Sequence, residues 1–65
     1  MIDLSNTKLT DDIYTPEEIS KILKVPASTI RYLLRRDDMI GFKVGRQYRV
    51  TKPDLEAFIE DNKRI

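Results

Sequence analysis

The chain has 65 residues, so it forms one domain at most. This length is near the lower limit at which a hydrophobic core is stable without disulfides or a structural metal ion. It contains no cysteine and no histidine, which excludes disulfides, thiolate or imidazole metal sites and histidine-based catalysis. The net charge is only +1, but the charges are unevenly distributed. Residues 21–52 contain nine Lys and Arg and two acids, while the segments on both sides are acidic. A basic centre of this kind indicates a polyanionic partner.

The first predicted element is a helix over about residues 16–24. Thr15 can cap its start, Pro16 suits the first helical position, and Glu18 completes a T-x-x-E capping box. Apolar residues then recur at helical spacing and predict a core-facing side, formed by Ile19, Ile22 and Leu23. Residues 1–12, which precede this helix, show little periodicity and are interpreted as an acidic N-terminal arm.

A second helix is predicted over about residues 27–36, after a tight turn in which Val25 packs inward. Pro26 is expected to end the first helix and to start the second. The apolar stripe of this helix consists of Ile30, Leu33 and Leu34. At about 100° per residue, the opposite face carries no acid and is formed by Ser28, Tyr32 and Arg35, flanked by Arg31 and Arg36.

The segment "IGFKVGRQYRV" alternates like a β-hairpin, predicted over about residues 41–50. Because register follows the buried face, a three-residue loop at residues 45–47 is preferred. That loop pairs Val44 with Tyr48 and Phe42 with Val50 on one face, and Lys43 with Arg49 on the other. Like charges opposed across a hairpin destabilise it, so a phosphate-bearing partner is expected to supply the counter-charge.

The last predicted helix covers about residues 53–63. Thr51 caps it, Pro53 lies in the first turn, and Asp54 stands three residues after the cap. Its apolar face consists of Leu55, Phe58 and Ile59. The order of elements predicts a single, mainly α domain with a small β-hairpin over residues 13–65, a winged helix-turn-helix. In such a fold the second helix enters the major groove of DNA with its N-terminal part.

Residues 14–59 resemble the excisionase-type DNA-binding domains of the wider MerR-like winged-helix group. The resemblance lies in "T-x-x-E", "V-P-A-S-T-I-R" and "F-K-V-G-R-Q-Y-R-V", and "STIRY" is similar to the recognition helix of MerR-type regulators. It implies that Ser28, Thr29, Arg31 and Tyr32 face DNA, with Lys43, Arg46 and Arg49 reaching it from the wing. The full predicted contact set adds the neighbouring Ala27, Arg35, Arg36 and Gln47.

The resemblance also implies a role. Excisionases of phages and mobile elements bind repeated sites side by side, bend DNA and turn an integrase towards excision. The alternatives are a small transcriptional repressor, the DNA-binding module of a longer protein, and a module that binds only proteins through its acidic ends. MerR-type regulators continue into an effector domain, whereas this chain stops at Ile65, so no small-molecule ligand is expected.

Other classes of function are not expected. The pairs Asp11-Asp12 and Asp37-Asp38 have no third ligand beside them, so no metal site is predicted. Without histidine, cysteine or a glycine-rich phosphate loop, neither an enzyme nor a cofactor is expected. No apolar run approaches the roughly 20 residues of a bilayer span, and the lack of cysteine fits a cytoplasmic protein. The free protein is expected to be a monomer, because no apolar face is left over.

Overall fold

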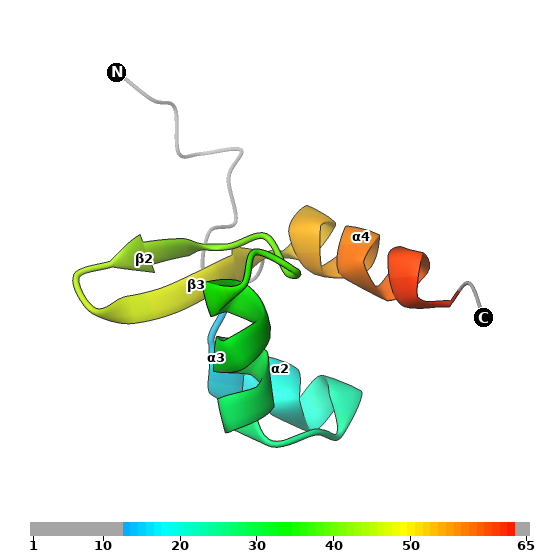
Figure 1. Ribbon diagram of the computed structural model, residues 1–65, viewed down its shortest axis with the longest axis horizontal. Helices are drawn as coiled ribbons and strands as arrows, with labels where there is room; N and C mark the ends of the chain where they lie inside the picture. The colour runs from blue at the N-terminus through cyan, green and yellow to red at the C-terminus, as the bar shows by residue number, and fades with distance from the viewer. Residues whose placement is uncertain (1–12, 64–65) are drawn as a thin grey trace.

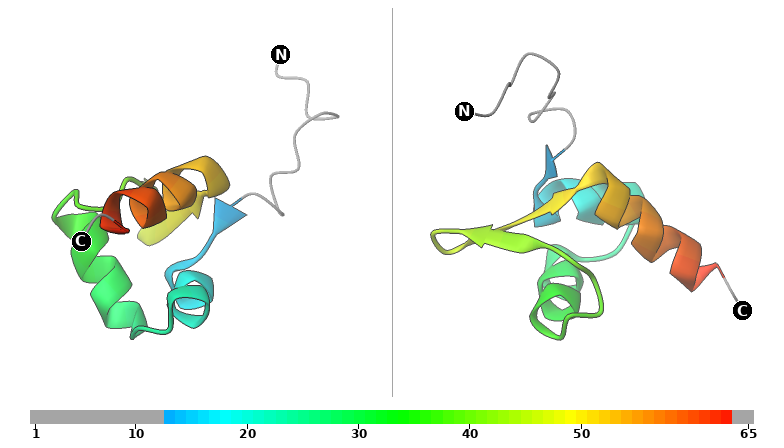
Figure 2. Two further views of the ribbon diagram at one scale, coloured as in Figure 1. Left: turned by 90° about the vertical axis from the view of Figure 1, so that its right-hand side faces the viewer. Right: turned by 90° about the horizontal axis from the view of Figure 1, so that it is seen from above.

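The computed structural model describes residues 13–63, and three helices and three short strands follow one another in it (Figure 1). In chain order they are β1 (Ile13–Tyr14), α2 (Pro16–Leu23), α3 (Ala27–Arg35), β2 (Phe42–Val44), β3 (Gln47–Thr51) and α4 (Lys52–Asn62). The β2–β3 hairpin and α4 extend to opposite sides of the body that α2 and α3 form with the strands (Figures 1 and 2). The predicted fold class, a small winged helix-turn-helix, is confirmed. The acidic arm predicted at residues 1–12 lies outside the described residues.

Helix α2 starts as predicted and ends differently. Thr15 Oγ1 accepts from the Glu18 amide at 3.0 Å, and Glu18 Oε1 accepts from the Thr15 amide at 2.8 Å, which completes the capping box. The helix ends at Leu23, one residue early, because Lys24 takes a left-handed conformation (φ 60°) and donates its amide to the Ser20 carbonyl. The expectation that Pro26 ends this helix is therefore wrong.

Pro26 instead begins α3, across a turn of the length that helix-turn-helix units use. It is the N-cap residue and supplies no side-chain cap, but its carbonyl accepts from the amides of Thr29 and Ile30 at 3.0 and 3.3 Å. Helix α3 ends at Arg35, one residue before the predicted end. Helix α4 is capped by Thr51 as predicted, but starts at Lys52 and ends at Asn62, each one residue early.

The core joins α2, α3, β3 and α4. Its six buried side chains are Ile19, Ile30, Leu34, Met39, Val50 and Leu55. Met39 was not expected there. It lies in the irregular segment after α3, where its amide donates to the Leu33 carbonyl at 3.2 Å, and this turn brings its side chain inward. Ile22 was expected in the core and is 50% exposed, since no element within residues 13–63 covers that side of α2.

A third strand, β1, was not predicted. It pairs antiparallel with β3, with Tyr14 opposite Val50 and Ile13 opposite Thr51, so that the sheet order is β1-β3-β2. A strand of two residues is too short to show an alternating pattern. Its position matters for the site, because it holds the start of α2 beside β3.

The register of the hairpin differs from the prediction. The loop has two residues, Gly45 and Arg46, and the opposed pairs are Phe42 with Arg49, Lys43 with Tyr48 and Val44 with Gln47. Gly45 has φ 63°, which fits a tight hairpin turn with glycine at its first central position. Lys43 and Arg49 are therefore not opposed, and the expected like-charge repulsion between them is absent.

Turn geometry decided this register because no buried face opposed it. All three residues of β2 are exposed, so the apolar pattern had nothing to pack against and could not select the three-residue loop. Phe42 is 41% and Val44 62% exposed, and the preceding Ile40 is 64% exposed. The expectation that no apolar surface is left over is therefore also wrong.

Replacing each of the two glycines with alanine should reduce the free energy of unfolding by a different amount. A Cβ on Gly41 would lie 2.6 Å from Leu34 Cδ2 and 2.8 Å from the Arg49 carbonyl oxygen, whereas a Cβ on Gly45 meets nothing within 4 Å but sits at φ 63°. We expect Gly41→Ala to lower the free energy of unfolding by about 1–3 kcal/mol through overpacking, and Gly45→Ala by about 1 kcal/mol through backbone strain. Urea unfolding of both variants tests this, and a larger loss for Gly45→Ala would contradict the close approach at Gly41.

Replacing Lys43 should destabilise the hairpin slightly, rather than stabilise it by removing a repulsion with Arg49. The Lys43 Nζ lies 4.9 Å from the centroid of the Tyr48 ring on the facing strand. Exposed cation–π contacts contribute about 0.5–1 kcal/mol, so Lys43→Thr should lose a few tenths to about 1 kcal/mol in thermal or urea unfolding. Lys43→Met, which keeps the alkyl chain without the charge, separates packing from the cation–π term. A gain in stability for both variants would contradict this expectation and indicate repulsion between Lys43 and Arg49.

Candidate nucleic-acid interface

Helix α3 presents its predicted contact residues on one outward face and its two flanks. Ser28, Thr29, Tyr32, Arg35 and Arg36 are exposed, while Ala27 and Arg31 are half-buried. The inward side carries Ile30 and Leu34, which anchor α3 in the core. The two sides of this face have different neighbours. Arg31 lies on the side next to α2 and the wing, and Arg36 lies on the side next to the segment after α3.

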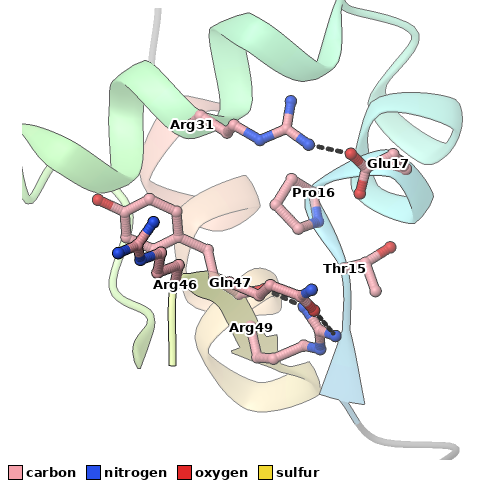
Figure 3. A pocket seen from close by; sticks show the side chains of 8 residues that line it. Thr15, Pro16, Glu17, Arg31, Arg46, Gln47 and Arg49 are labelled. Carbon is pink, nitrogen blue, oxygen red and sulfur yellow. Dashed lines mark hydrogen bonds and ion pairs between the residues drawn. The ribbon is translucent and has the colours of Figure 1, made fainter. Parts of the chain in front are cut away.

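A cleft of about 360 Å³ opens on the Arg31 flank, between α3, the hairpin and the start of α2 (Figure 3). It is lined by Thr15, Pro16, Glu17, Arg31, Arg46, Gln47, Tyr48 and Arg49. Four of the predicted contact residues thus come together here, three of them arginines from two elements that are far apart in sequence. Among residues 13–63, Glu17 is the only acid that lines this cleft.

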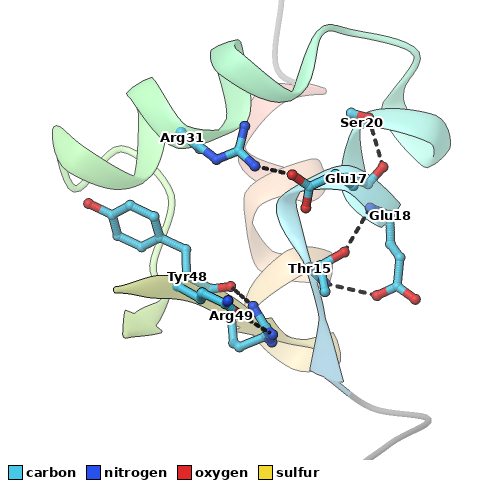
Figure 4. Close-up of polar contacts among 8 residues, drawn as sticks. Thr15, Glu17, Glu18, Ser20, Arg31, Tyr48 and Arg49 are labelled. Carbon is cyan, nitrogen blue, oxygen red and sulfur yellow. Dashed lines mark hydrogen bonds and ion pairs between the residues drawn. The ribbon is translucent and has the colours of Figure 1, made fainter. Parts of the chain in front are cut away.

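Arg31 crosses the cleft and forms an ion pair with Glu17 (Figures 3 and 4). The two side chains remain 43% and 58% exposed, so solvent and larger ligands can reach them. The pKa of Glu17 is lowered, first by a hydrogen bond from its own backbone amide and then, against some desolvation, by the charges of Arg31 and Arg49. The carboxylate is therefore ionised at neutral pH and offsets part of the arginine charge.

Sequence reasoning missed Glu17 as a member of the site. Its position in the first turn of α2 already has a local explanation, because acids are favourable at helix N-termini. The partner, Arg31, lies fourteen residues away. No spacing rule links the two, and only the packing of α2 against α3 brings them together.

The other flank of α3 holds a second group of polar side chains. Arg36 donates to the Tyr32 hydroxyl and to Asp38 Oδ2, both at 3.1 Å, and its guanidinium lies 5.3 Å from the centroid of the Tyr32 ring. The hydrogen bond to Asp38 is the largest cause that raises the pKa of Arg36, followed by the bond to Tyr32. Asp38, considered from the sequence only as half of a carboxylate pair without a third metal ligand, is the partner of a predicted DNA-contacting arginine.

The wing residues also have local partners. Arg49 donates from Nη1 to the Tyr48 carbonyl at 2.7 Å and from Nη2 to Gln47 Oε1 at 2.8 Å. Lys43 lies over the Tyr48 ring, while Arg46 occupies the exposed tip of the turn beside Gly45. The wing therefore carries three cations, of which Arg46 extends furthest along the hairpin.

No group of three or more residues suited to hold a metal ion occurs within residues 13–63. No helix in this described part is both long and apolar enough to cross a membrane.

Comparison with known proteins identifies the family of the chain. A family described as "Helix-turn-helix domain" matches residues 13–63, which is most of the chain. The uncharacterized protein YvgK of Bacillus subtilis (strain 168) is 38% identical over 45 residues, 69% of this chain but 15% of that protein, so the chain spans a small part of the relative. No solved structure matches. The fold and the family match together show that this chain belongs to the helix-turn-helix domain family and is a DNA-binding domain.

Proposed function

We propose that the chain binds double-stranded DNA sequence-specifically, with α3 in the major groove and the β2–β3 hairpin as a wing beside it. The observation that carries this proposal is the cleft, where Arg31 of α3 and Arg46 and Arg49 of the wing converge on one surface. Arginine suits this place because its planar guanidinium matches phosphate oxygens and guanine edges. A duplex lying against α3 and the wing would place its backbone across this cleft.

The contact residues divide by position. Ser28, Tyr32 and Arg35 point outward from α3 and are the candidates for reading base edges. Arg31, Lys43 and Arg49 lie beside or between the elements and are the candidates for gripping phosphates. Arg46, at the exposed tip of the wing, is the candidate for contacting a minor groove, where a narrow A·T-rich groove favours arginine.

The biological role that we propose is excision. The motifs that resemble excisionase-type domains include the first part of α3 and most of the wing, and these two elements are the ones predicted to touch DNA. One domain of this size contacts a short stretch of duplex. We therefore expect several copies to bind side by side on repeated sites, bend the DNA and assist an integrase.

A second role is favoured by the relative. In YvgK the similar 45 residues make up 15% of the protein, so a related domain occurs there as a small part of a larger chain. That arrangement fits a DNA-binding module that recruits another activity to a site. A small repressor would use the same interface, because blocking a promoter requires only tight binding.

Selection of bound duplexes from a random pool would give the site, and a reaction with that site then tests the role. If the chain is an excision factor, adding it to an integrase and a DNA substrate with paired attachment sites should raise the excised product and suppress integration. Circularly permuted fragments should show a bend. Site-specific binding without any effect on excision, together with repression of a reporter promoter, would favour the repressor.

Arg31→Ala should weaken binding to the selected site and to random DNA by the same factor. Because Arg31 lies in the cleft rather than on the outward face, it is expected to grip phosphate. Such a contact carries no sequence information, so its loss should leave the ratio of the two affinities unchanged. Fluorescence anisotropy measures both affinities. Lys63→Ala is the matched control, since Lys63 pairs with Glu60 at the end of α4, away from the cleft.

A loss confined to the selected site, of about 1–3 kcal/mol, would instead make Arg31 a base-reading residue. Unchanged affinity for both duplexes would contradict the assignment of α3 as the recognition helix.

A further inference from the structure

We propose that Glu17 competes with the DNA backbone for Arg31. Glu17 pairs with Arg31 in the free protein, and a DNA phosphate replaces Glu17 as the partner of Arg31 on binding. This inference rests on the proposed function of the cleft. Glu17 lies outside the predicted contact set. The proposed exchange would make it a determinant of the DNA affinity of the domain and of how that affinity depends on salt.

The place of Glu17 supports this role. It belongs to α2, but its carboxylate reaches Arg31 of α3 inside the cleft where the wing arginines also lie. Arg49 also lowers the pKa of Glu17, though less than Arg31 does. An acid paired with an arginine of this cleft occupies the cation that an entering phosphate needs.

The fold does not require this carboxylate to start α2. The capping box is formed by Thr15 and the neighbouring Glu18, through the bonds of 3.0 and 2.8 Å. Ser20 Oγ donates to the backbone carbonyl of Glu17 at 2.7 Å and does not involve its side chain (Figure 4). The carboxylate of Glu17 is therefore available for a task across the cleft.

The pair is suited to exchange because it is exposed. Ion pairs between solvent-exposed side chains are weak, and a phosphate offers arginine a bidentate, charge-assisted contact in return. The exchange also alters the salt dependence. A new arginine–phosphate contact releases a counterion from DNA, but the carboxylate left behind takes up a cation, so the two changes offset each other.

The test compares Glu17→Gln with Glu18→Gln on a random-sequence duplex of about 20 base pairs, enough to cover a single domain. Both substitutions remove one negative charge from the first turn of α2, and glutamine at residue 18 can keep the capping box. We expect Glu17→Gln to raise affinity about two- to fivefold at low salt and to steepen the slope of log K against log salt by up to about 0.9. Glu18→Gln should change both quantities clearly less.

A double-mutant cycle with Arg31→Ala identifies the mechanism. If Glu17 acts by holding Arg31, the gain from Glu17→Gln should disappear when Arg31 is already alanine. A gain that persists in that background, or an equal gain for Glu18→Gln, would overturn the inference in favour of general charge repulsion. A loss of affinity in Glu17→Gln would overturn it in the other direction, making Glu17 a residue that positions Arg31 for DNA.

Two controls keep these outcomes separate from other failures. Thermal unfolding of each variant shows whether the domain is folded, and Glu17→Gln should melt close to the unsubstituted protein because the pair is exposed. If the unsubstituted protein does not bind the random duplex even at low salt, the proposed function fails. If it binds and Glu17→Gln changes nothing, the proposed function stands and the role of Glu17 is rejected.

Discussion

The packing of α3 against β3 and α2 is the contact on which the rest of the molecule depends. Ile30 and Leu34 bury the inward side of α3 in the same cluster as Ile19 of α2 and Val50 of β3. A chain of this length without disulfides or described metal ligands has little else to hold it. Because that one side of α3 is committed to the core, the orientation of its polar side is fixed as well, and with it the cleft beside the wing.

Four cations of the candidate interface make weak, mostly exposed contacts within the domain. Arg31 bonds to Glu17, Arg36 to Asp38 and Tyr32, Arg49 to Gln47 and the Tyr48 carbonyl, and Lys43 lies over the Tyr48 ring. These contacts reduce the repulsion that a basic surface would otherwise impose on a small fold. A DNA phosphate can replace each of them at modest cost. The charge of the surface is thereby available for binding without strongly destabilising the free domain.

The hairpin shows where pattern reasoning reaches its limit. Alternation in residues 41–50 suggested an apolar face, and that assumption selected the wrong loop. In the structure β2 is exposed along its length, so no burial energy depended on which face carried Phe42 and Val44. The turn at Gly45, with its φ of 63°, had a definite conformational preference and determined the register.

Features that depend on residues close together in the chain could be predicted without the structure. Thr15 with Glu18 and Thr51 with Asp54 start two helices through bonds between residues three apart, and the apolar spacing of α3 identifies its inward side. The order of the elements then indicated the fold class, while the family was inferred from the resemblance of the quoted motifs to known domains. Contacts between distant segments became visible only in the folded chain: β1 beside β3, Met39 in the core, and Glu17 against Arg31. Such contacts depend on how helices and strands pack in space, and packing is fixed by the whole set of buried side chains rather than by any local pattern.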